Sequence, residues 1–89
     1  MDSFTTERFW KAFEKLPDDV QIQAKKTYEL WQKEPYHDSL QFKRIHNKRP
    51  IYSVRIGIHH RAIGIKEDEA LTWFWIGSHA DYDKLIDSM

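Results

Sequence analysis

The chain has 89 residues, a formal net charge of zero and no cysteine, which predicts one domain over residues 1–89 and excludes disulfide scaffolds, thiolate nucleophiles and cysteine-ligated metal sites. With 40% hydrophobic and 31% charged residues, the composition is that of a folded globular protein and not of a disordered one. No signal peptide is visible at the start, and no apolar run approaches the ~20 residues that cross a bilayer, so we expect a cytoplasmic protein without membrane contact.

Two helices are predicted in the first third of the chain. Apolar residues from Phe9 to Leu16 recur at helical spacing after a threonine that can cap a helix, and a short strand around Phe4 can precede them. Pro17 and two aspartates begin a second helix, which ends before Pro35. Because the connection is short, we expect a helical hairpin. We assign its aromatic residues to the core: Phe9, Trp10, Phe13, Tyr28 and Trp31.

Four strands are predicted after Pro35, where the apolar period changes to two. They are centred on Leu40–Ile45, Tyr52–Ile56, Arg61–Lys66 and Leu71–Ile76, and tight turns join them into an antiparallel meander. Ser78 can cap a short C-terminal helix. The sequence therefore predicts an α+β fold, with an N-terminal helical hairpin packed on one face of a four-stranded, mainly antiparallel sheet and a short C-terminal helix.

The neutral total hides a segregation of charge. Seven of the 14 lysines and arginines lie between Ser39 and Lys66, a stretch without any acidic residue, so the remaining chain carries all 14 acids. A zero net charge therefore does not exclude a polyanionic partner. The basic run in this stretch either follows a phosphate backbone or forms a solvated hairpin tip; it comprises Lys43, Arg44, His46, Lys48 and Arg49.

The strongest local signal is the segment from Gly77 to Tyr82. With Ser78 as helix cap, His79 is the first helical residue, where the macrodipole favours a neutral imidazole that can act as a base, while the nearby aspartates act in the opposite sense. Tyr82 lies three residues later, on the same side of the first turn. The alternative is that His79 ends a strand and Tyr82 belongs to the core.

Arg55 and Arg61 form a second candidate pair, on neighbouring strands joined by a tight turn. Alternation puts Arg55 opposite the apolar face of its strand, while Arg61 either shares the face of Ile63 or is displaced by a bulge. Two guanidinium groups can hold a phosphodiester and stabilise its transition state, although surface arginines are also ordinary. The five histidines lack any paired ligand spacing, so no metal site is predicted.

Three stretches, in order and spacing, resemble the RelE/ParE superfamily of toxins from type II toxin–antitoxin modules, nearest to its HigB- and RelE-like branch. They are Tyr52–Gly57 (YSVRIG), His60–Ile65 (HRAIGI) and Trp75–Tyr82 (WIGSHADY), and the resemblance spans roughly Phe9 to Ile86. It implies a ribosome-dependent endoribonuclease that cleaves messenger RNA in the decoding site and inhibits translation. It also implies that no metal or other cofactor is used, and that a cognate antitoxin wraps over the enzyme to neutralise it.

The resemblance also assigns roles to single residues. Arg55 and Arg61 match the strand arginines that hold and stabilise the phosphate, and His79 matches the polar catalytic position after the last strand. Tyr82 matches a tyrosine that stacks on a base or assists proton transfer. Less specific contacts with messenger and ribosomal RNA are expected from Lys43, Arg44, Lys48, Arg49 and His60.

Two departures from the family pattern keep alternatives open. Ile51 and Ser53 stand where strongly active RelE members carry lysines, which shifts acid–base chemistry onto His79, and the chain is neutral where such toxins are usually basic. One alternative is a ParE-like inhibitor of DNA gyrase without nuclease activity. The other is an inactive relative that only binds an antitoxin.

Overall fold

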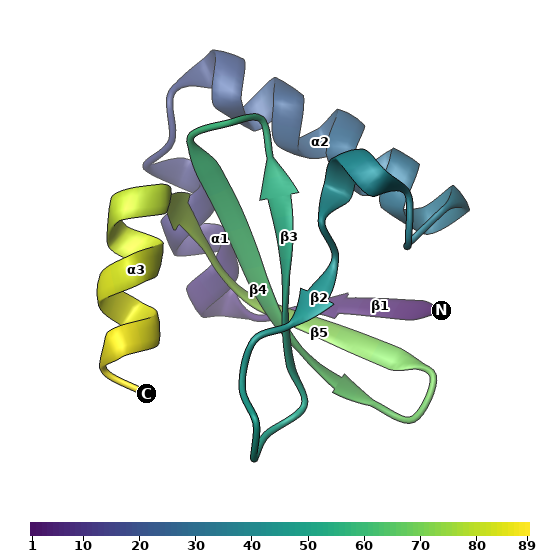
Figure 1. Cartoon of the computed structure of the whole chain (residues 1–89). Coiled ribbons are helices and arrows are strands. Elements are labelled where there is room, and N and C mark those ends of the chain that lie inside the picture. The colour runs from purple at the N-terminus through teal and green to yellow at the C-terminus, as the bar shows by residue number, and fades with distance from the viewer.

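The computed structural model describes all residues, 1–89, and contains a five-stranded sheet in the order β1-β5-β4-β3-β2 (Figure 1). The predicted α+β fold is confirmed, with two N-terminal helices and one C-terminal helix. The elements are β1 (Asp2–Thr5), α1 (Glu7–Glu14), α2 (Asp18–Lys33), the 3-10 segment η1 (Asp38–Leu40), β2 (Lys43–Arg44), β3 (Ile51–Ile56), β4 (His60–Glu67), β5 (Ala70–Ser78) and α3 (His79–Asp87).

The sheet has one strand more than the four predicted. The short segment around Phe4 forms β1, which pairs in parallel with β5, while all other neighbouring strands are antiparallel. The chain therefore begins at one edge of the sheet and returns to that side at its last strand. No helix combines the length and the apolar character that spanning a membrane requires.

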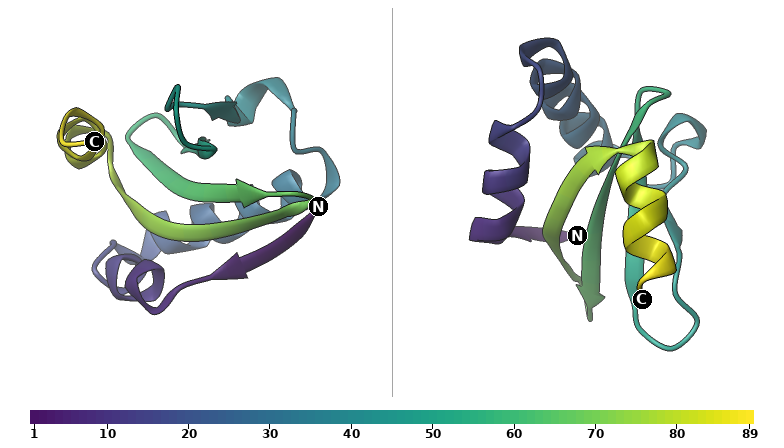
Figure 2. Two further views of the ribbon diagram at one scale, coloured as in Figure 1. Left: turned by 90° about the horizontal axis from the view of Figure 1, so that it is seen from below. Right: turned by 90° about the vertical axis from the view of Figure 1, so that its left-hand side faces the viewer.

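The helices cover both faces of the sheet, which corrects the prediction of one covered face. The right-hand view of Figure 2 shows α1 and α2 on one side of the strands and α3 on the other. The reason is that β3 and β4 are apolar on both faces: Val54 and Ala62 point towards α1 and α2, whereas Ile51 and Ile63 point towards α3. Both apolar faces must be removed from water.

Three local signals confirm the helix boundaries. The hydroxyl of Thr6 accepts a hydrogen bond from the backbone N–H of Phe9 at 3.1 Å, and α1 follows it. In the same way, Ser78 Oγ accepts from the N–H of Asp81 at 3.2 Å and caps α3. Helix α2 ends at Lys33, before Pro35. The two capping interactions satisfy backbone donors that the first helical turn leaves without partners.

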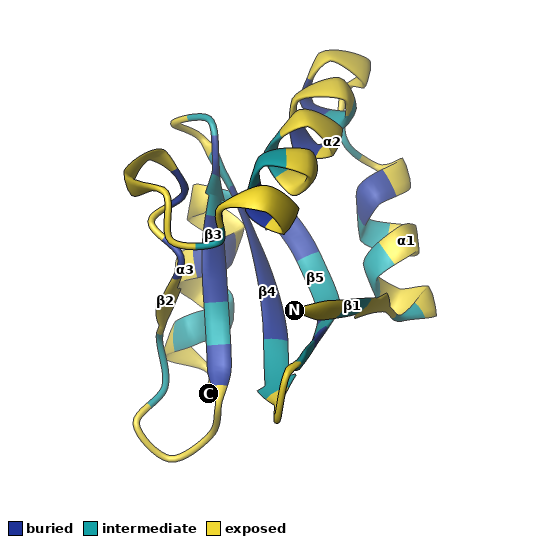
Figure 3. Cartoon of the chain, turned by 90° about the vertical axis from the view of Figure 1, so that its right-hand side faces the viewer, coloured by how far each residue is buried: buried dark blue, intermediate teal, exposed yellow.

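The aromatic residues of the two helices are only partly in the core. Phe13 and Trp31 are buried, but Trp10 is 46% and Tyr28 38% exposed, which corrects their assignment to the core. Helix α1 contacts β5 and α2 contacts β3, and the two helices diverge from the turn between them (Figure 1). Because each helix presents only a narrow stripe to the sheet, the side that faces away from the sheet remains exposed, as Figure 3 shows.

The first predicted strand is shorter than its apolar pattern indicates. Leu40 belongs to η1, and β2 consists of Lys43 and Arg44 alone. Gln41 lies between them with φ 45° and ψ 43°, in the left-handed region. An extended strand cannot continue through that conformation, which non-glycine residues adopt rarely.

A β-bulge lets β5 contribute to both faces of the sheet. The register between β4 and β5 shifts at Ile63 and Gly64, so that Trp73 and Ile76 join the larger apolar cluster while Trp75 packs against the smaller one. The bulge leaves Arg61 paired with Gly77. A Cβ atom on Gly77 would lie 2.5 Å from the Trp75 ring, so any other residue at this position would displace that ring.

Candidate functional site

Arg55 and Arg61 lie directly opposite each other on β3 and β4. Cross-strand partners share a face, and this face is the one that α3 partly covers. The Nε of Arg55 donates a 2.7 Å hydrogen bond to the carbonyl oxygen of Gly57. Gly57 lies in the turn between β3 and β4 and has a φ of +59°. Two like charges placed opposite each other repel, so the pair favours an anion between or beside them.

The side chain of Arg61 is buried and held by two neutral acceptors. The residue is 7% exposed. Its Nη1 donates to Ser53 Oγ at 3.1 Å, and its Nη2 donates to Gln41 Oε1 at 2.8 Å. A guanidinium carries five N–H donors, so three remain after these two contacts.

No carboxylate neutralises Arg61. The molecule contains the ion pair Lys11–Glu7 and a contact between His79 and Asp83, which is an ion pair when the imidazole is protonated, and neither includes an arginine. Buried charges in proteins are normally paired, because removing a charge from water without compensation is costly. The site is therefore a partly buried positive centre that an anionic group such as a phosphate can complete.

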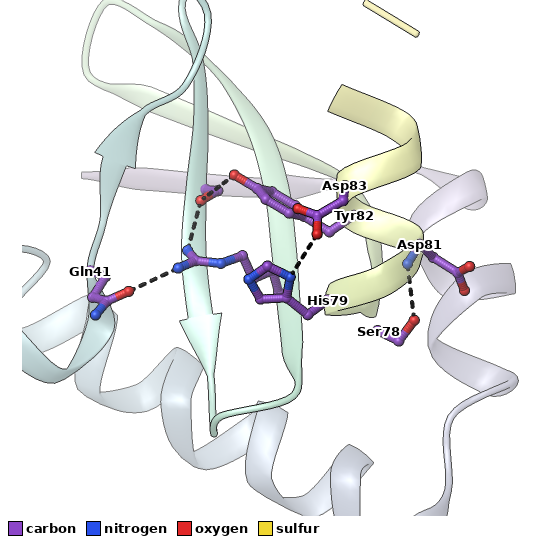
Figure 4. Close-up of polar contacts among 8 residues, drawn as sticks. Gln41, Ser78, His79, Asp81, Tyr82 and Asp83 are labelled. Atoms are coloured by element: carbon purple, nitrogen blue, oxygen red, sulfur yellow. Dashed lines mark hydrogen bonds and ion pairs between the residues drawn. The ribbon is translucent and has the colours of Figure 1, made fainter. Parts of the chain in front are cut away.

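Tyr82 connects Arg61 to the start of α3. Its ring centroid lies 5.3 Å from Arg61 Cζ, an arrangement in which the ring face attracts the cation. The Tyr82 hydroxyl lies 3.5 Å from Ser53 Oγ, so hydrogen bonds run from Gln41 through Arg61 and Ser53 to Tyr82 (Figure 4). Tyr82 is 9% exposed and also belongs to the smaller apolar cluster, so it is both core and part of the site.

His79 lies next to Tyr82, with ring centroids 5.6 Å apart and an edge-to-face orientation. It is the first residue of α3, and its backbone N–H donates to the carbonyl oxygen of His59 at 2.7 Å. The Nδ1 atom lies 3.3 Å from Asp83 Oδ2, and the histidine side chain is half exposed. With Nδ1–H directed to Asp83, Nε2 is the nitrogen that can exchange a proton with a bound molecule.

The predicted basic run contains residues that stabilise the turn after β2 and residues whose side chains are exposed. Lys43 pairs with Ser53 and so lies on the face of the arginines. Arg44 Nε donates to carbonyl oxygens of His46 and Arg49, at 2.9 and 3.2 Å. The Nδ1 of His46 accepts from the N–H groups of Lys48 and Arg49, at 3.1 and 3.0 Å. Arg44 and His46 thus fix a turn from which two exposed cationic side chains project.

His60 is not brought to this cluster. It precedes Arg61 on β4, and successive strand residues point to opposite faces. It lines instead a cavity of about 640 Å³ between α1 and α3, together with residues such as Arg8, Lys11 and Lys84. No three histidine, aspartate or glutamate side chains are arranged to hold a metal ion.

Three residues that contact Arg61 or His79 were not among the site residues predicted from the sequence: Gln41, Ser53 and Asp83. Asp83 follows His79 by four residues on a predicted helix, and that spacing places two side chains side by side. Ser53 could have been suspected as a polar residue in an apolar strand, and it is fully buried. Nothing in the sequence indicates Gln41, whose contact with Arg61 joins residues 20 positions apart.

A family model described as the ParE-like toxin domain matches residues 18–84. The chain belongs to this family. The resemblance of its three sequence stretches to the RelE/ParE superfamily is thereby confirmed, and the chain is a RelE/ParE-like toxin domain. Comparison with curated proteins gives no significant match.

Solved structures of distant sequence share the fold. The chain is similar to a structure of the RelB–RelE antitoxin–toxin complex from Methanococcus jannaschii, with a TM-score of 0.74, 14% identity and coverage of 92% of this chain and 96% of that one. YafQ from Escherichia coli gives a TM-score of 0.73, 13% identity and coverage of 91% and 96%. The isolated RelE toxin of Escherichia coli gives a TM-score of 0.66, 16% identity and coverage of 99% and 98%.

Proposed function

We propose that this toxin is a ribosome-dependent messenger RNA endoribonuclease that inhibits translation, as in the RelE- and HigB-like branch. The observation that carries the proposal is the buried guanidinium of Arg61, which has no carboxylate partner and lies opposite Arg55. A scissile phosphate supplies the missing negative charge. In the transition state its charge increases, and preorganised donors in a partly dry site then stabilise it most.

The proposed reaction uses the side chains of the site. The ribose 2′-oxygen attacks the adjacent phosphorus and forms a P–O bond, while the bond from phosphorus to the 5′-oxygen of the next nucleotide breaks. His79 Nε2 is placed to take the 2′-hydroxyl proton or to give one to the leaving oxygen, because Asp83 holds Nδ1. Arg55 and Arg61 stabilise the pentacovalent phosphorane. The products are a 2′,3′-cyclic phosphate and a 5′-hydroxyl.

Tyr82 and the exposed cations complete the proposed assignment. The Tyr82 ring stacks on a base or assists the proton transfer. Its contact with Arg61 places the ring next to the guanidinium that holds the phosphate. Lys43, Lys48 and Arg49 contact RNA phosphates of the transcript or the ribosome, whereas Arg44 acts through the shape of the turn. A cognate antitoxin is the second proposed partner, which the RelB–RelE complex of Methanococcus jannaschii supports.

Two observations favour a second candidate function, inhibition of DNA gyrase. The family model that matches the chain is the ParE-like one, and the β3 lysines of strongly active RelE members are replaced by Ile51 and Ser53. A gyrase inhibitor acts by binding, so it does not need His79 as a proton carrier. The role of His79 therefore separates the two functions.

Expression in a bacterial host tests the proposal. We expect wild-type protein to arrest growth and to yield cleaved transcripts, and His79→Ala to lower cleavage by roughly 100-fold or more. Asp83→Asn should cause a smaller loss, and Asp87→Asn, an exposed carboxylate on the same helix, should have no effect. Growth arrest with intact transcripts and blocked DNA supercoiling would establish the gyrase function. No arrest by the wild type would indicate an inactive, antitoxin-binding relative.

A further inference from the structure

We propose that Gln41 is a positioning residue that holds the Arg61 guanidinium towards the phosphate while leaving its positive charge uncompensated. This inference rests on the proposed function of the site. Gln41 lies between η1 and β2, far from Arg61 in sequence, and its Oε1 accepts from Arg61 Nη2 at 2.8 Å. Figure 4 shows Gln41 reaching into the cluster from the side opposite α3.

The backbone of Gln41 adopts an uncommon conformation. Gln41 and Asp68 are the two non-glycine residues with positive φ, and Asp68 lies in the tight turn between β4 and β5, where aspartate tolerates this region. Glycine or asparagine is the usual residue for a left-handed segment end. Gln41 lacks the backbone freedom of those residues, and its longer side chain reaches Arg61.

The chemistry of the acceptor is the second argument. A carboxylate at this position would bind a buried arginine more strongly than an amide does, and would neutralise it. Gln41 and Ser53 instead offer one neutral oxygen to each terminal nitrogen. Two such contacts fix the plane of the guanidinium and leave one N–H on each terminal nitrogen, together with the Nε–H, for an anion.

Three substitutions of Gln41 separate its effect on the position of the Arg61 guanidinium from its effect on the charge of the site. Gln41→Glu keeps the reach and adds a negative charge. Gln41→Asn keeps a neutral amide and tolerates the left-handed backbone, but it is one methylene too short to contact Arg61. Gln41→Gly removes the side chain and suits the backbone, and so controls for the turn itself.

Each variant is measured for thermal stability, for cleavage of messenger RNA on programmed ribosomes, and for stabilisation by inorganic phosphate relative to chloride at equal ionic strength. We expect Gln41→Glu to melt at or above the wild-type temperature, to lose cleavage by roughly 100-fold and to lose the phosphate effect. Gln41→Asn and Gln41→Gly should melt near the wild type and lose cleavage by about tenfold.

The outcomes distinguish this inference from the function on which it rests. If the wild type cleaves and a folded Gln41→Glu cleaves equally well, the positioning role is wrong and the nuclease function stands. If the wild type binds phosphate without cleaving, the nuclease function fails, and loss of phosphate binding in Gln41→Glu still supports the role of Gln41. If Gln41→Glu does not fold, unchanged cleavage by Gln41→Asn refutes the inference. A wild type that neither cleaves nor binds phosphate refutes both.

Discussion

The two faces of the sheet differ in composition and in what covers them. The face towards α1 and α2 contains a cluster of 11 buried residues, all of them apolar or aromatic. The face towards α3 contains a cluster of three buried residues and, in addition, the two buried polar side chains of the molecule, Ser53 and Arg61. The face towards α1 and α2 therefore removes more apolar side chains from water, while the face towards α3 can hold a costly charge.

Strand geometry makes this division possible. Alternate residues of β3 and β4 point to opposite faces, so Ser53, Arg55 and Arg61 share one face and the apolar residues between them share the other. A polar residue on the α3 side therefore does not interrupt the larger cluster. Substitutions on the two faces should consequently separate stability from activity.

The largest effect is expected from Trp31→Ala on the apolar face. Trp31 is 1% exposed and packs edge-to-face on Trp73 and Phe42. Its loss should lower the free energy of unfolding by about 3–5 kcal/mol, a large part of the about 5–15 kcal/mol of a typical domain. Chemical denaturation measures the change.

Trp31→Phe is the matched control, because Trp31 Nε1 has no hydrogen-bond partner to lose. It should cost clearly less than the alanine variant. A Trp31→Ala protein as stable as the wild type would show that the apolar face is not the main source of stability.

Arg61→Met should reduce cleavage without reducing the free energy of unfolding. Methionine replaces an uncompensated buried charge by an apolar chain of similar length, so the free energy of unfolding should stay equal or rise by up to about 2 kcal/mol. Cleavage should fall by roughly 1000-fold, because the phosphorane loses a donor. Thermal melts and ribosome cleavage assays measure the two quantities.

Arg61→Lys is the companion variant, since it keeps the charge and loses the planar fork. It should retain part of the activity. A marked loss of stability in Arg61→Met with unchanged cleavage would make Arg61 a structural residue and remove the contrast between the two faces.

The smallest effect is expected at the exposed turn after β2. The double variant Lys48→Ala and Arg49→Ala should change the free energy of unfolding by less than about 0.5 kcal/mol. Its affinity for RNA should fall a few-fold, and the logarithmic salt dependence of that affinity should weaken by about 0.7 for each phosphate that the variant no longer neutralises. Lys33→Ala, an exposed lysine at the end of α2, should leave both unchanged. An unchanged salt dependence in the double variant would exclude this turn from RNA binding.

Much of the local structure could be predicted from the sequence, because its causes are local. Thr6 and Ser78 cap helices through residues three positions away, and Pro35 ends a helix through its own ring. Alternation along β3 predicted the face of Arg55, and a short turn was enough to bring Arg61 beside it. Sequence spacing also fixed the adjacency of His79 and Tyr82.

Other features depend on where distant parts of the chain meet, so they become visible only in the folded molecule. The parallel pairing of β1 with β5, the position of α3 on the second face, and the exposure of Trp10 all follow from packing between remote elements. The same holds for Gln41, which reaches Arg61 only because the chain folds back through η1 and β2. The charges that the protein carries follow from its amino-acid composition, whereas the burial of Arg61 without a counterion follows from the fold. This difference arises because local geometry depends on neighbours in sequence, whereas the environment of a charge depends on neighbours in space.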